Sequence, residues 1–247
     1  MAYFINSQTE LVIRSTVIFV GKLSRPNTVK AQAFSFLFLL MFQVGQAQSA
    51  DFQFVFGSKA LKIDSSYVVS QTQISIETIR FYVSGVALYK GGSLVWKEAE
   101  SYHLIDALKT ESLRIAIPEV DADKMVFLIG TDSLTNVSGA MGGDLDPSKG
   151  MYWAWNSGYI NFKLEGTSSV CDTRNNAFQF HLGGYAYPNA TVQSVELERT
   201  SNTILVDVKA FLEGVDLAKH NTVMSPGQEA VTLAKRTATI FRMKNEK

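Results

Sequence analysis

The segment ISIETIRFYVSGVALYKGG, residues 74–92, predicts the fold class of the chain. Apolar residues alternate with polar ones from Ile74 and again from Phe81, which is typical of strands with one buried face. The segment therefore contains the pieces of two strands. Ser84-Gly85 between them predicts a β-bulge or a bend, because glycine adopts backbone angles that other residues avoid.

Short runs of the same kind lie on both sides of this segment, separated by turn residues. DFQFVFGS, residues 51–58, places three phenylalanines on one face of a strand, and residues 93–108 predict a hairpin that turns around 98–101. Further runs are found at 112–118, 124–130, 159–166, 177–184, 190–198 and 202–211. At least eight short strands without a repeat or a linker predict an all-β protein, a single β-sandwich of short antiparallel strands.

A long loop interrupts this pattern near the middle of the chain. TDSLTNVSGAMGGDLDPSKG, residues 131–150, is rich in Gly, Asp and Ser, and loops of this length are usually functional or disordered. Asp144 and Asp146 resemble the start of a calcium loop, but the glycine lies one place late and no acidic residue closes the loop. A turn from Asp146 to Gly150 is the simpler interpretation, and calcium is a weak alternative.

The end of the chain predicts a helix. In SPGQEAVTLAKRTATIFRM, residues 225–243, Ser225 is placed to cap the helix and Pro226 to occupy its first position. Glu229 lies in the first turn, where a negative charge is favourable.

Residues 1–47 are expected to be a leader, and residues 48–247 the folded domain. AFSFLFLLMF, residues 33–42, has a basic residue before it and small polar residues after it, the order of a secretory signal. About ten apolar residues are too few to cross a bilayer as a helix, so the mature protein is expected to have no stable membrane span. The protein is expected to be exported to the periplasm, the cell surface or the medium. A second apolar run within 1–28 favours a true start near Val29, with a long leader or an anchor as the alternative.

Composition and motifs argue against several classes of function. The formal net charge is zero and no basic run occurs, so nucleic acid is not an expected partner. The chain has no nucleophile elbow, no H-E-x-x-H, no phosphate loop and no C-x-x-C, and we therefore expect no enzymatic activity. Cys171 is the only cysteine, which excludes a disulfide within the chain.

Candidate chemistry is concentrated in DLDPSKGMYWAWNSGYINFKLEG, residues 144–166. If residues 151–155 are extended, Met151, Trp153 and Trp155 share one face, with successive side chains roughly 6.6 Å apart. Aromatic rings this close can pass an electron hole from one to the next. Packing in an apolar core is the alternative.

Histidines are scarce, although imidazole is the commonest metal ligand and the usual general base. The chain has three. His181 lies in a predicted strand on the face opposite Phe178 and Phe180, His103 also lies in a strand, and His220 precedes the C-terminal helix and is expected to face solvent. A structural histidine is the alternative at each position.

Three segments together are similar to the MbnP-like family of bacterial exported proteins. They are GTDSLTNVSGAMGGDLDPSKGMYWAWNSGYINFKLEG (130–166), FQFHLGGY (178–185) and the earlier strand motif IRFYVSGVALY (79–89). The family includes the methanobactin-associated MbnP proteins and the copper-repressible surface proteins of methane oxidisers. The resemblance covers roughly residues 51–243.

This resemblance implies an exported all-β domain linked to copper. In studied relatives a partner di-haem cytochrome c peroxidase-like enzyme oxidises a tryptophan to kynurenine, which helps histidines to bind copper. Carried over, Trp153 or Trp155 is the modified residue and His181 the first imidazole ligand. One relative has a histidine two places after its modified tryptophan, where Trp155 stands here. His103 or Met151 would then have to complete the site.

The predicted function is therefore an exported metal-handling protein, with copper as the expected metal and a tryptophan-rich motif oxidised by a partner peroxidase. The alternative is a metal-free binding or structural β-sandwich of the periplasm or cell surface.

Overall fold

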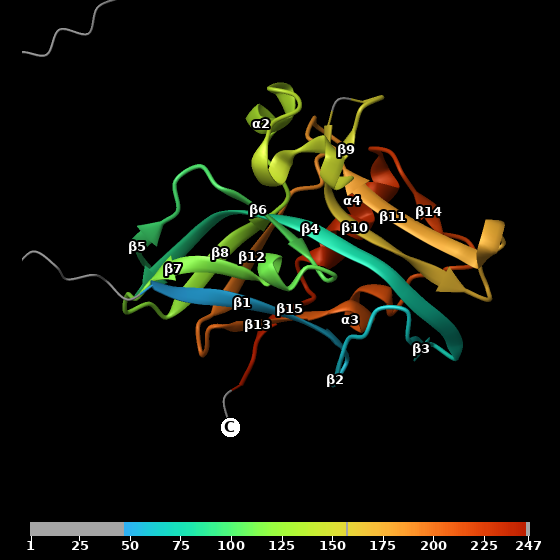
Figure 1. Cartoon of the computed structure of the whole chain (residues 1–247), viewed down its shortest axis with the longest axis horizontal. Helices are drawn as coiled ribbons and strands as arrows, with labels where there is room; N and C mark the ends of the chain where they lie inside the picture. Colours follow the sequence, from blue (N-terminus) through green and yellow to red (C-terminus); the bar gives the residue numbers. More distant parts are fainter. Residues whose placement is uncertain (1–46, 157, 246–247) are drawn as a thin grey trace, which may run out of the picture. The chain divides into compact units, whose positions relative to one another are not determined.

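The computed structural model describes residues 47–156 and 158–245, so the predicted leader, apart from Ala47, lies outside the described residues. The described chain is mainly β with few helices, as the sequence predicts, and forms two sheets (Figure 1). Both sheets contain parallel as well as antiparallel pairs, so the prediction of an antiparallel sandwich is wrong in this respect. Within the described residues, none of the helices has the length and apolar character that a membrane crossing requires.

The elements follow one another in a long series of short strands. The strands are β1 (Ala47–Phe56), β2 (Lys59–Ala60), β3 (Ser66–Val69), β4 (Thr72–Lys90), β5 (Ser93–Lys97), β6 (Tyr102–Asp106), β7 (Arg114–Pro118), β8 (Lys124–Ile129), β9 (Tyr152–Trp153), β10 (Gly158–Ser168), β11 (Ala177–Gly183), β12 (Gln193–Glu198), β13 (Thr203–Asp207), β14 (Thr222–Val223) and β15 (Phe241–Met243). The α-helices are α2 (Ser133–Val137), α3 (Val208–Leu212) and α4 (Gln228–Thr237). The 3-10 helices are η1 (Thr110–Leu113), η2 (Gly143–Leu145), η3 (Pro147–Lys149) and η4 (Arg174–Asn176).

The smaller sheet has the strand order β15-β13-β1-β2, with β7 also paired to β1. Strand β1 runs parallel to β13, a strand from the other end of the domain. The predicted alternation in β1 is confirmed, because Phe52, Phe54 and Phe56 are all buried in the main core.

The larger sheet is built around β4 and curls into a half-barrel. Along one edge β4 pairs with β3, β6 and β5 in turn, and along the other with β10 and then β8. Residues 74–92 thus lie in one long strand that bends, rather than in two separate strands. The bend is the predicted bulge, since Gly85 has φ +60° and the register with β8 shifts between Ser84 and Ala87.

The predicted hairpin over residues 93–108 is wrong. Strands β5 and β6 both pair with β4 and not with each other, so the turn between them carries the chain along one edge of β4. The core lies between the two sheets, where the Phe52 ring packs edge-on against Phe81 at 5.9 Å. A single long partner strand therefore replaces the local pairing that the sequence suggested.

Short helices replace most of the predicted central loop. Asp132 caps α2 by accepting a hydrogen bond from Thr135 N at 2.7 Å. The turn predicted around 146–150 is confirmed, because Asp146 accepts from the backbone N–H of Ser148 and Gly150 has a left-handed conformation. These helices cover a second, smaller apolar cluster on the outer face of the larger sheet. Its members are Tyr82, Leu104, Leu145, Met151, Trp153, Tyr159 and Ile160.

The C-terminal helix is present but starts later than predicted. Helix α4 begins at Gln228 after Gly227, so Ser225 does not cap it and Pro226 lies before its first turn. Glu229 is in the first turn as predicted. The helix ends at Thr237, and the chain returns to the smaller sheet as β15.

Candidate functional site

The two tryptophans lie in a tight hairpin between β9 and β10. Trp153 pairs with Gly158, and a turn over residues 154–156 follows. Residues 151–155 are therefore not extended throughout, and Trp155 leaves the face that Met151 and Trp153 share. Trp153 is 5% exposed and Trp155 is 67% exposed. Their ring centroids are nevertheless only 5.7 Å apart, at an interplanar angle of 44°.

Trp153 packs directly on the backbone of β11. A Cβ atom at Gly183 would lie 2.6 Å from Cζ3 of Trp153 and 2.6 Å from the carbonyl oxygen of Tyr159. Glycine is thus required at this position for the indole to reach the strand. His181 is two residues before Gly183, on the same face of β11, about 6.6 Å along the strand. The hairpin therefore places an indole over Gly183, two residues along β11 from His181.

His181 is buried and paired with a carboxylate. Its neighbours Phe178 and Phe180 belong to the main core, which confirms that His181 lies on the opposite face. Nε2 of His181 lies 2.6 Å from Oε1 of Glu165 on β10, and because a carboxylate only accepts, Nε2 is the donor. Nζ of Lys163 lies 3.4 Å from the same oxygen. Burial alone would raise the pKa of Glu165, but the hydrogen bond from His181 and the charge of Lys163 lower it to about 2.

Charged and polar side chains form a row across the outer face of the larger sheet, from His181 on β11 through β10 and β4 to Asp106 on β6. The register places His181 opposite Lys163, Lys163 opposite Arg80, and Arg80 opposite Asp106. Nε of Arg80 lies 2.9 Å from Oδ2 of Asp106, and Nη1 of Arg80 donates to the carbonyl oxygen of Lys149. The row thus holds the segment before the tryptophan hairpin in place.

His103 is not brought to the same place as His181. It lies on β6, separated from β11 by β4 and β10, which is roughly 14 Å across three strand spacings. It pairs with Val83, whose side chain is in the main core, so it projects from the other face of the sheet. Its Nε2 contacts Glu98 at 2.9 Å.

Met151 is fully buried within the second apolar cluster. Asp144 and Asp146 are engaged within the covering segment. Asp144 accepts from Leu104 N at 3.0 Å and pairs with Lys149. His220 is exposed as expected and pairs with Glu229. Of the residues singled out from the sequence, the structure brings Trp153 and Trp155 together and packs Trp153 on Gly183, two residues from His181.

The residues around His181 fit one imidazole ligand of a metal ion. A histidine that binds a metal usually donates its other ring N–H to a carboxylate, as His181 does to Glu165. In the part of the chain that the structure describes, however, no three His, Cys, Asp or Glu side chains are grouped so that they could hold an ion. The two-histidine arrangement expected from the resemblance is therefore not formed by His181 and His103.

Sequence reasoning missed Glu165 and Lys163 as neighbours of His181. The alternation of Lys163 and Glu165 with buried residues on β10 shows that they face away from the core. Their pairing with β11 depends on a strand register that the sequence does not state. The pair Gly183-Gly184 was a visible signal for close approach of another group.

Together these features define a β-rich domain in which a tryptophan hairpin packs on β11 at Gly183, two residues from a buried histidine–carboxylate pair. A family model described as MbnP matches residues 46–225, and the chain belongs to the MbnP family. The solved structure of MbnP from Methylosinus trichosporium has the same fold, with a TM-score of 0.55 and 15% sequence identity over 75% of this chain and 86% of that one. No curated protein matches the chain.

Proposed function

We propose that the chain is an exported, non-enzymatic copper-handling protein whose tryptophan pair is oxidised by a partner di-haem peroxidase. The observation that carries this proposal is the placement of Trp153. Its ring lies 5.7 Å from that of the exposed Trp155 and packs on Gly183, two residues from His181. Export is supported by the predicted leader at residues 1–47.

Trp153 is the better placed of the two residues for modification. Oxidation with two molecules of hydrogen peroxide opens the indole to N-formylkynurenine and releases two molecules of water. Hydrolysis then releases formate and leaves kynurenine, which carries an aniline nitrogen and a ketone. At Trp153 these new donor groups would arise close to Gly183, two residues from His181, whereas at Trp155 they would face solvent.

Copper is the metal that the family implies. Imidazole and other nitrogen donors suit copper among the first-row metals. The unmodified chain supplies His181 but not His103 or Met151 at this place, and the donor groups of an oxidised Trp153 would add to the site. We therefore expect oxidation to increase the affinity for copper.

The test uses the purified chain, a di-haem peroxidase and hydrogen peroxide. The intact mass should rise by two oxygen atoms, or correspond to kynurenine after loss of the formyl group, and a new near-ultraviolet band should appear. Peptide mapping should place the change at Trp153, and Trp153→Phe should prevent it. An unchanged mass, or a change elsewhere in the chain, would contradict the proposal.

A metal-free binding or structural domain is the second candidate. Two observations favour it. The 2.6 Å hydrogen bond to Glu165 already satisfies Nε2 of His181, and Met151, a possible thioether ligand, is completely buried in the second apolar cluster. A chain that is neither oxidised by the peroxidase nor able to bind copper would support this candidate.

A further inference from the structure

A second soft donor lies next to His181 on the outer edge of the larger sheet. Strand β14 runs parallel to β11, with Thr222 opposite Gln179 and Val223 opposite Phe180. Continuing this register by one residue places Met224 beside His181. Two residues later, Cβ of Pro226 would lie 3.2 Å from a Cβ built at Gly184, the residue after β11. The chain that follows β14 therefore stays close to the end of β11 on both sides of Met224 in the sequence.

Met224 follows directly after β14, and extending the alternation of side chains by one residue places it on the same face as His181. Val223 is buried in the main core together with Phe180, so its neighbours in the chain project to the opposite face. That is the face on which His181 and the Trp153 ring lie. Met224 is 40% exposed, whereas His181 is buried.

An imidazole and a thioether form a donor set with a definite preference. Thioether sulfur selects soft cations such as Cu(I), whereas hard cations prefer oxygen. Glu165 engages Nε2 of His181 and thereby orients the ring with Nδ1 as its basic nitrogen. The charge of Glu165 is in turn offset by Lys163, so the carboxylate is not free to attract a hard ion.

We propose that Met224 and His181 together bind a soft monovalent cation, Cu(I), in the unmodified chain. This inference deepens the proposed function by naming the residue that replaces the missing second imidazole. It rests on the copper part of that proposal and not on the oxidation of tryptophan.

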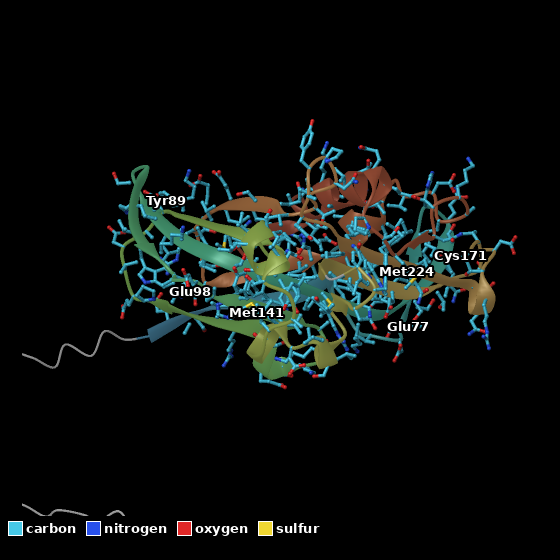
Figure 2. The ribbon with its side chains drawn as sticks, turned by 90° about the horizontal axis from the view of Figure 1, so that it is seen from above. Glu77, Tyr89, Glu98, Met141, Cys171 and Met224 are labelled. Carbon is cyan, nitrogen blue, oxygen red and sulfur yellow. The ribbon has the colours of Figure 1, made fainter. Side chains whose placement is uncertain are left out.

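The test titrates the unmodified chain with Cu(I) under anaerobic, reducing conditions against a chromophoric chelator, and separately with Ag(I). Met224→Leu removes the sulfur and keeps the volume of the side chain. We expect it to weaken binding by about tenfold or more, at least the effect of removing an outer partner of a metal ligand. Met141→Leu is the matched control, because Met141 is similarly exposed, at 44%, and Figure 2 shows it far from Met224 on the molecule.

A measurement on the unaltered chain removes any dependence on the folding of variants. With methyl-labelled methionine, Ag(I) should shift the Met224 resonance and leave those of Met141 and Met151 in place. No binding by the unaltered chain, an unchanged affinity in Met224→Leu, or a shift confined to other methionines would overturn the inference. None of these results depends on the peroxidase, so oxidation of Trp153 can succeed or fail independently.

Discussion

Nε2 of His181 donates to Oε1 of Glu165 at 2.6 Å, across the boundary between β11 and β10. The contact is diagonal, because His181 stands opposite Lys163 and Glu165 stands opposite Gln179. The same carboxylate oxygen also lies 3.4 Å from Nζ of Lys163. His181 and Glu165 are mostly shielded from water, with side-chain exposures of 8% and 21%. The pair fixes the orientation of the His181 imidazole, two residues from the glycine on which Trp153 packs.

The lowered pKa of Glu165 predicts sensitivity to acid. Its pKa falls from 4.5 to about 2 on folding, so its contribution to stability is present above pH 4.5 and is lost as the pH falls toward 2. Allowing for solvent screening, we expect Glu165→Gln to lower the free energy of unfolding by about 1–2 kcal/mol at neutral pH. Urea unfolding at several pH values should show that the free energy of unfolding falls less between pH 4.5 and 2 in the variant than in the unaltered chain. An equal loss in both proteins would contradict this assignment.

Copper binding by the oxidised chain should depend on one histidine. His181→Ala should abolish it, as measured by metal content after gel filtration, while circular dichroism shows that the fold is kept. His103→Ala is the matched control, because His103 also pairs with a carboxylate but projects from the other face of the sheet. If the two variants lose copper equally, His181 does not have the assigned role.

Trp155 should carry oxidising equivalents from the surface to Trp153. Phenylalanine is much harder to oxidise, so Trp155→Phe should slow modification of Trp153 by about tenfold or more, equivalent to about 1.4 kcal/mol in the barrier. The measurement is the time course of the intact mass with peroxidase and hydrogen peroxide. Tyr187→Phe is the control, since Tyr187 is 96% exposed and lines a cavity of about 190 Å³ with Trp153. Unchanged kinetics in Trp155→Phe would exclude a relay.

Gly183→Ala should disturb the hairpin. The added methyl group would lie 2.6 Å from the Trp153 ring, and such overpacking costs about 1–3 kcal/mol. We expect the free energy of unfolding, measured with urea, to fall by that amount and the tryptophan fluorescence to change. Gly142→Ala meets no atom within 4 Å and should differ little from the unaltered chain. Similar stabilities for the two variants would show that the indole does not rest on Gly183.

Local features of the fold could be read from the sequence. The phenylalanines of β1 follow a period of two, and Gly85 marks the bulge in β4, because both signals lie within a few residues. The parallel pairs and the half-barrel could not be predicted, since they depend on which distant segments meet. Residues 93–108 are an example of this limit to prediction. Their sequence is typical of a hairpin, and yet β5 and β6 both pair with β4 and not with each other.

The candidate site was predicted in part. Trp153 and Trp155 lie in one short motif, and the structure brings their rings to 5.7 Å and packs Trp153 on Gly183, two residues from His181. The exposure of Trp155 depends on the turn after Trp153, which the assumption of an extended strand did not include. Glu165 became visible only through the register of β10 with β11.

The parallel pairing of β1 with β13 has a consequence for biosynthesis. Gly57 and Asp207 are joined by a hydrogen bond although they are 150 residues apart, so the first strand has no permanent neighbour on that side until nearly the whole polypeptide has been made. The domain cannot close while its last strands are still in the ribosome. Such delayed closure would keep the chain threadable, as passage through a narrow translocation channel requires.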